Sequence, residues 1–141
     1  MRRTRRWIVV APLVVLALLS ACGEVPETES ELKEPMTLEP IEGTEFSRVI
    51  LTARAVERLG IETITVTGGG QRTTVPASAV WVGVNGEEWL YTAPEPLVFV
   101  REVVSVDRYE GDVAVLSDGP ETGTQIVTVG VPELIGSEFG I

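Results

Sequence analysis

The chain has 141 residues, enough for one domain with little room for a second. It contains no histidine and a single cysteine, which excludes an internal disulfide, imidazole-based acid–base catalysis and nearly all zinc, copper and haem sites. The formal net charge of −10 argues against nucleic acid as a partner, and no residue pattern calls for a cofactor.

The first 21 residues read as a secretory leader. A basic start with four arginines is followed by an apolar run over 7–19 and by the small residues Ser20 and Ala21. The apolar run is shorter than the roughly 20 residues that a stable membrane span needs. We therefore predict a cleaved signal peptide over 1–21, with a retained signal anchor as the alternative.

The segment Leu19-Ser20-Ala21-Cys22 at the end of this leader resembles the lipobox of bacterial lipoprotein precursors. In that family the cysteine thiol receives a diacylglycerol group, and cleavage leaves the cysteine as the new N-terminus. The resemblance implies cleavage between Ala21 and Cys22 and attachment of acyl chains such as palmitate at Cys22. Because each buried methylene contributes about 0.8 kcal/mol, two or three chains hold a protein firmly to membrane lipid. We expect an extracytoplasmic, lipid-anchored protein, in the periplasm or on the outer surface of the cell. An unmodified thiol beside an ordinary cleavage site is the alternative.

The chain after the leader is strongly acidic. It carries seven basic and 21 acidic residues, so its formal charge is −14. Residues 23–45 hold eight of the glutamates, one lysine and three prolines, and their sparse apolar residues show no sustained period. We predict an acidic disordered tether over 22–45. A calcium-binding or partner-binding segment is the alternative.

The remaining residues, 46–141, predict a domain that is all-β, mainly an antiparallel small sandwich or barrel. Thr52 and Gly60 are suited to begin and end a short helix over 53–59. Runs rich in β-branched residues between turn formers predict further elements in chain order: strands over 48–51, 61–66, 72–75, 97–106, 112–116 and 124–129, and a helical turn over 131–137.

A β-hairpin is predicted between residues 80 and 92. Asn85-Gly86 favours a two-residue type I′ turn, which places Val82 opposite Trp89. In this register Trp81 and Leu90 lie on the other face, so both faces are partly apolar. The hairpin is then either sandwiched inside the domain or offers one face to a partner. Trp81 and Leu90 are the candidates for that partner face, and plain core residues are the alternative.

The segment VPASAVWV, the hairpin ending in WLYT, and the residues from FVREVV to the C-terminus together resemble a known domain. It is the C-terminal membrane-proximal domain of periplasmic adaptor subunits, the membrane fusion proteins that partner RND and ABC-type exporters. The earlier run ILTARAVERLGIETITV resembles the adaptor segment that precedes the lipoyl domain. The positions that match the family pattern are Val75, Pro76, Ala79, Val80, Trp89, Tyr91, Phe99, Arg101, Val104, Gly111, Val113, Val115, Gly119, Gly123, Val127, Thr128, Gly130 and Leu134.

The chain departs from a full adaptor in two respects. The lipoyl, helical-hairpin and barrel domains that adaptors carry between these two segments are missing, and Pro120 replaces the usual leucine of the "GL..G" loop. What the resemblance implies is therefore a location and a surface, namely a module that lies against a membrane exporter near the bilayer.

The sequence predicts a protein that binds rather than catalyses. Its serines lack a histidine base, and adjacent Glu87 and Glu88 face opposite sides of a strand. Asp112, Asp118 and Glu121 lack the spacing of an EF-hand loop, so we expect no metal site. Two hypotheses remain: a non-catalytic adaptor or accessory module for an exporter of the RND or ABC type, and a ligand-binding envelope lipoprotein unrelated to transport.

Overall fold

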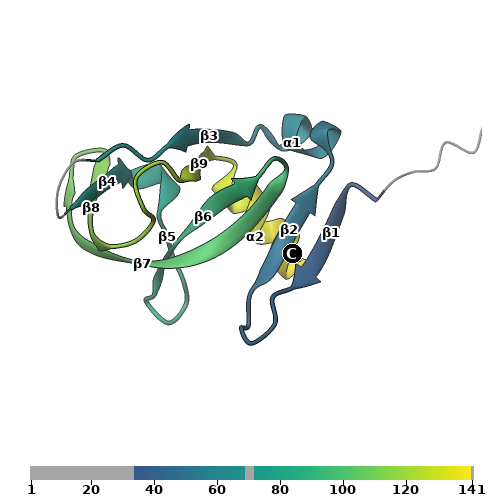
Figure 1. Cartoon of the computed structure of the whole chain (residues 1–141), viewed down its shortest axis with the longest axis horizontal. Coiled ribbons are helices and arrows are strands. Elements are labelled where there is room, and N and C mark those ends of the chain that lie inside the picture. Colours follow the sequence, from purple (N-terminus) through teal and green to yellow (C-terminus); the bar gives the residue numbers. More distant parts are fainter. Residues whose placement is uncertain (1–33, 69–71, 141) are drawn as a thin grey trace, which may run out of the picture. The chain divides into compact units, whose positions relative to one another are not determined.

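Nine strands and two α-helices make up the part of the chain that the computed structural model describes, residues 34–68 and 72–140 (Figure 1). In chain order they are β1 (Met36–Pro40), β2 (Ser47–Leu51), α1 (Ala53–Leu59), β3 (Glu62–Thr65), β4 (Thr73–Pro76), the 3₁₀ turn η1 (Ala77–Ala79), β5 (Trp81–Val82), β6 (Glu88–Glu95), β7 (Val98–Glu110), β8 (Val113–Asp118), β9 (Gln125–Val129) and α2 (Val131–Phe139). The predicted β-rich, antiparallel fold with a short early helix is confirmed, and the predicted closing turn is the helix α2. The leader, Ala21, Cys22 and the first part of the predicted tether lie outside the described residues.

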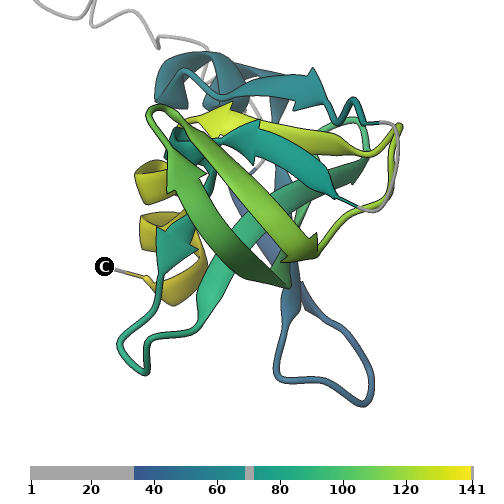
Figure 2. The same ribbon diagram turned by 90° about the vertical axis from the view of Figure 1, so that its left-hand side faces the viewer.

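The long strand β7 organises the sheet. Its first half pairs with β2 and β6, while its second half, from Ser105 onward, pairs with β8. Two register shifts between Ser105 and Arg108 accompany the change of partner, and such irregularities bend a strand. The remaining pairings give the order β1-β2-β7-β6-β9-β3, with β5 on β6 and β4 on β8. The sheet thus folds over itself without closing into a barrel (Figure 2).

Both faces of the β6–β7 pair are buried. Leu90 and Val104 point into one hydrophobic cluster, and Tyr91 and Phe99 point into a second one. The first cluster is completed by Val66, Val75, Ala79, Ala114, Leu116 and Ile126, and the second by Val49, Leu51, Val127, Val131 and Leu134. Of the two predicted arrangements for the hairpin, the sandwiched one is therefore observed for β6.

The helix α1 forms where the sequence predicted it. The side chain of Thr52 accepts a hydrogen bond from the backbone N–H of Ala55, which satisfies one of the free donors at the helix start. Gly60 takes a left-handed conformation with φ of 64°, and its N–H donates to the carbonyls of the last turn. Short-range chemistry at both ends thus fixes this element.

The strand β1 corrects the predicted tether. Residues 36–40 lie inside the segment 22–45 that was predicted to be disordered, yet they pair with β2 from Met36 opposite Leu51 to Pro40 opposite Ser47. Met36 also packs against the second hydrophobic cluster. The ladder with β2 supplies the order that the polar, glutamate-rich sequence could not supply alone. The folded domain therefore begins before the predicted boundary at residue 46.

The β5–β6 hairpin has a different register from the predicted one. Trp81 lies opposite Trp89, and the loop has three residues, Val84–Gly86, instead of two. The N–H of Gly83 donates to the carbonyl of Glu87 at 2.8 Å, and Gly86 has a φ of 81°, as the left-handed last residue of a three-residue loop requires. A one-residue shift reverses the faces, so Trp81 shares a face with Trp89 rather than with Leu90.

A tight glycine joins β9 to α2. Gly130 has a φ of 87°, and a Cβ built on it would lie 2.8 Å from Cγ1 and 3.1 Å from Cα of Ile61. Only glycine fits this position without a shift of the neighbouring backbone. The contact fixes where α2 begins.

Candidate docking groove

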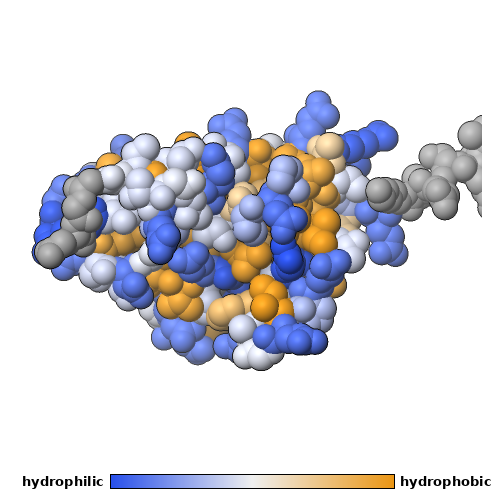
Figure 3. All heavy atoms as spheres, in the orientation of Figure 1, coloured by the Kyte–Doolittle hydropathy of each residue, from blue (hydrophilic) through white to orange (hydrophobic). Residues whose placement is uncertain are grey.

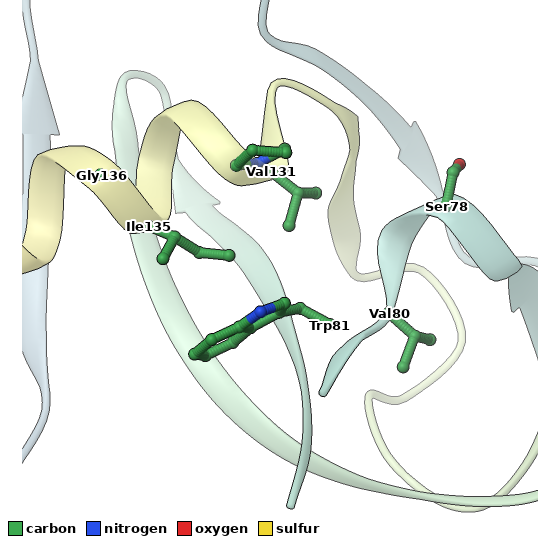
Figure 4. A pocket seen from close by; sticks show the side chains of 7 residues that line it. Ser78, Val80, Trp81, Val131, Ile135 and Gly136 are labelled. Carbon is green, nitrogen blue, oxygen red and sulfur yellow. The ribbon is translucent and has the colours of Figure 1, made fainter. Parts of the chain in front are cut away.

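An apolar groove runs between α2 and the η1–β5 segment. Its volume is about 550 Å³, and it is lined by Ser78, Val80, Trp81, Val131, Pro132, Ile135 and Gly136 (Figure 4). The only side-chain hydroxyl of the lining belongs to Ser78, and it donates to the carbonyl of Thr128 at 3.2 Å. The walls offer no charged side chain, so the groove is suited to hold apolar groups. We call it the α2 groove.

Trp81 forms one wall of the α2 groove. Figure 4 shows its indole ring lying across from Ile135 of α2. The ring is partly buried, and its centroid lies 6.4 Å from that of Phe139 at the end of the helix. A large, fixed aromatic surface at the edge of an apolar groove is the type of residue that contributes most to protein interfaces.

The second wall is α2 itself. Its buried residues, Val131 and Leu134, face the sheet, while Pro132 and Gly136 remain at the surface side of the helix. The same two residues also line a second groove of about 570 Å³ on the opposite flank of α2, together with Met36, Leu59, Glu133, Ser137 and Gly140. The helix α2 therefore has a groove on each of its two flanks.

A buried ion pair holds α2 on the sheet. Nε of Arg101 in β7 donates to Oε1 of Glu138 at 2.9 Å, and the hydroxyl of Tyr91 in β6 donates to Oε2 at 2.6 Å. The side chains of Arg101 and Glu138 are only 10% and 5% exposed. Burial, and then the bond to the Glu138 carboxylate, raise the pKa of Tyr91 well above its ordinary range. We call these three residues the Arg101 latch.

Aromatic rings surround the guanidinium of this latch. The Cζ atom of Arg101 lies 5.0 Å from the ring centroid of Phe46, and 4.9 Å from each of those of Trp89 and Phe139. Such cation–π contacts contribute about 0.5–2 kcal/mol each. They join the loop before β2, the central sheet and the end of α2, and so fix the position of the helix that forms the groove wall.

The structure separates the two residues predicted as a partner face. Leu90 is fully buried in the first hydrophobic cluster, so the prediction for it is wrong, and the alternative of a plain core residue holds. Trp81 lies on the other side of the sheet, at the α2 groove. The prediction placed them together because it assumed a two-residue turn.

The sequence did not predict the Arg101 latch. Arg101 entered only as one position of a family pattern, and Glu138 lies 37 residues further along the chain. No local spacing signals a pair of this kind. The one signal in the sequence is an arginine within a predicted strand, 97–106, that is otherwise mostly apolar.

The acidic residues considered for metal binding do not gather. Within 34–68 and 72–140 there is no group of three or more histidine, cysteine or acidic residues that could hold a metal ion. Burial, and then the negative charge of Asp118, raise the pKa of the Glu102 carboxyl. Two carboxylates alone define no binding site.

Figure 3 shows one face of the described residues. Apolar residues there stand in several small groups separated by hydrophilic ones. Neither α1 nor α2, the helices of the described part, is long and apolar enough to cross a membrane. The α2 groove combines a hollow, an aromatic wall and a helix held by the Arg101 latch.

No protein-family model, curated protein or solved structure matches this chain.

Proposed function

We propose that this protein is a non-catalytic binding module, held outside the cell by lipid on Cys22, that docks on a membrane protein through the α2 groove. The observation that carries the proposal is the groove itself, an apolar hollow between Trp81 and Ile135 with no acid–base side chain in its lining. Such a surface binds a partner by removing apolar area from water, and it offers no group for acid–base catalysis. The resemblance to adaptor subunits supports an exporter of the RND or ABC type as the partner.

The start of β1 limits how far the domain can stand from its proposed anchor. Thirteen residues separate Cys22 from Met36, the first residue of β1. Fully extended, this stretch spans at most about 50 Å, whereas a 23-residue tether would span about 80 Å. With lipid on Cys22, this length keeps the domain within reach of membrane proteins, which supports docking on one of them.

Site-specific crosslinking in intact cells tests the docking. p-Benzoylphenylalanine in place of Pro132, at the rim of the groove, should give an adduct with an inner-membrane protein on illumination. The same probe in place of the exposed Tyr109, on the β7–β8 hairpin, should give none. Ile135→Glu, which puts a charge into the groove, should abolish the adduct while the protein level is unchanged.

The anchor is tested separately. Mass spectrometry of the native protein should find an acylated Cys22 as the first residue, and Cys22→Ala should prevent both acylation and the adduct at position 132. An unmodified Cys22 with the leader still attached would overturn the anchor. Adducts of equal yield at positions 132 and 109, or no inner-membrane protein at all, would overturn docking through the groove.

The volume of the α2 groove also falls within the range of small-molecule sites, about 300–1,000 Å³. This favours, as a second candidate, binding of a small apolar ligand by an envelope lipoprotein. Thermal unfolding of the full-length protein with a panel of apolar compounds separates the two. A compound that raises the midpoint of the wild type but not of Ile135→Glu would support ligand binding.

A further inference from the structure

The short strand β5 leaves one of its edges without a strand partner. Within the described residues β5 pairs with β6 alone. Because Gly83 donates to Glu87 across this pair, and antiparallel bonding alternates from one residue to the next, Trp81 also bonds toward β6. The N–H and C=O groups of Val82, and the C=O of Val80, then point toward the open edge. The N–H of Val80 is already bonded to the carbonyl of Ala77.

This open edge adjoins the α2 groove. Val80 contributes its C=O to the edge and its side chain to the groove, the side chain of Trp81 also lines the groove, and Figure 4 shows the two residues following one another along the rim. The groove could therefore receive side chains from the same segment whose backbone bonds to β5. A strand carries alternate side chains to opposite faces, so every second side chain of such a segment would enter the groove.

The other edge strands, β1, β3 and β4, each carry a feature that hinders pairing, which in β4 is the terminal Pro76. The strand β1 follows Pro35 and ends at Pro40, which cannot donate, with a charged Glu39 before it. The strand β3 starts with Glu62 and has a register shift directly after it. Prolines, charges and irregular register are the usual means of blocking an edge strand. Neither residue of β5 is a proline or a charged residue, and a groove lies beside it.

We propose that the α2 groove and the β5 edge together bind an extended segment of the partner protein, which adds to the sheet as a strand beside Trp81–Val82. Strand addition of this kind uses main-chain hydrogen bonds for affinity and pockets for alternate side chains for specificity. The inference rests on the proposed docking function and names the form in which the partner is held.

The chemistry of the segment follows from its surroundings. Side chains that enter the groove are apolar, because the lining is apolar. The remaining positions favour lysine and arginine, because the chain after the leader carries a formal net charge of −14 and the exposed Glu87 lies beside the end of β5.

Three pools of synthetic peptides test the proposal against the full-length lipoprotein in detergent. The first holds nine-residue peptides that alternate valine or isoleucine with a position randomised over lysine, arginine, serine and threonine. The second has the same side chains with an N-methyl group at every second residue, which removes the donors of one edge. The third holds amphipathic helical peptides of equal charge. We expect the first pool to bind and the other two to bind at least about fivefold more weakly.

A matched pair of variants tests the protein side. Val82→Pro removes the N–H that points to the open edge, at a position where an edge strand tolerates proline, while Val82→Ala keeps it. We expect Val82→Pro to weaken binding of the first pool about fivefold or more and Val82→Ala to change it less than twofold. Hydrogen exchange of the wild type gives a check that needs no variant, since the Val82 amide should slow when the first pool is added.

The outcomes separate this inference from the docking function. If the crosslink at position 132 forms but the helical pool binds best, or the N-methylated pool binds as well as the first, docking stands and strand addition is overturned. Equal binding by Val82→Pro and Val82→Ala, or an unchanged Val82 amide, overturns it as well. Binding of the first pool without any crosslink in cells supports the edge site and overturns the membrane-protein partner.

Discussion

Removal of the carboxylate at Glu138 should destabilise the domain strongly, because it leaves a buried arginine without its partner. Breaking a buried ion pair from one side costs about 3–5 kcal/mol. We expect a value near the lower end, about 3 kcal/mol, for Glu138→Ala, because the Arg101 guanidinium keeps its contacts with three aromatic rings and its side chain is 10% exposed. The Tyr91 hydroxyl also loses its acceptor.

Urea unfolding, followed by tryptophan fluorescence and circular dichroism, measures this loss. At a slope of about 1.5 kcal/mol per molar urea, 3 kcal/mol lowers the midpoint by about 2 M. Glu133→Ala is the matched control, since this exposed glutamate in the first turn of α2 should contribute less than about 1 kcal/mol. Replacement of both Arg101 and Glu138 by methionine should recover most of the stability, because no unpaired charge remains. Equal losses for Glu138→Ala and Glu133→Ala would refute the Arg101 latch.

Three further outcomes follow from the packing and the titrating groups. Gly130→Ala should lower the free energy of unfolding by at least about 2 kcal/mol, because the new Cβ would clash with Ile61. Gly111 is also left-handed but faces open space, so Gly111→Ala should lower it by only about 1 kcal/mol. Equal urea midpoints for the two variants would contradict the clash. Because the pKa of Glu102 is raised in the folded state, this carboxyl stabilises the fold below about pH 4.5, and the stability should be lost as the pH rises from 4.5 through the raised pKa. The melting temperature of the wild type should therefore fall over this pH range, and that of Glu102→Gln should fall less. A steeper fall for Glu102→Gln would contradict the raised pKa of Glu102. Burial, and hydrogen bonds to carboxylates, raise the pKa of Tyr91 and Tyr109, so absorbance at 295 nm should increase only above pH 10 in the folded protein and near pH 10 in urea.

Local signals in the sequence predicted most of the elements correctly. Thr52 and Gly60 carry the chemistry that begins and ends α1, and runs of β-branched residues mark β2, β3, β4, β7, β8 and β9. Each of these signals acts over a few residues, so the sequence alone contains it. The strand β1 lacks such a signal, because it is ordered by its pairing with β2 rather than by its own composition.

The candidate site was harder to predict because it depends on distant residues. Asn85-Gly86 favours a two-residue turn, but Gly86 serves equally as the last residue of a three-residue loop. With the longer loop, Trp81 and Leu90 lie on opposite sides of the sheet, where they pack on two different hydrophobic clusters. The members of each cluster come from distant parts of the sequence. The ion pair of Arg101 and Glu138 also joins distant parts of the sequence, and it forms only when α2 packs on the sheet.

The strand β7, which pairs with three other strands, has a mechanical consequence. Its first half is bonded to β2 and β6 and its second half to β8, so neither half of the domain can open without loosening a strand that the other half shares. We expect amides on both halves of β7 to exchange with solvent in one cooperative event rather than in two. A force applied to β1 would then pass through β2 and the shared strand β7 to β8.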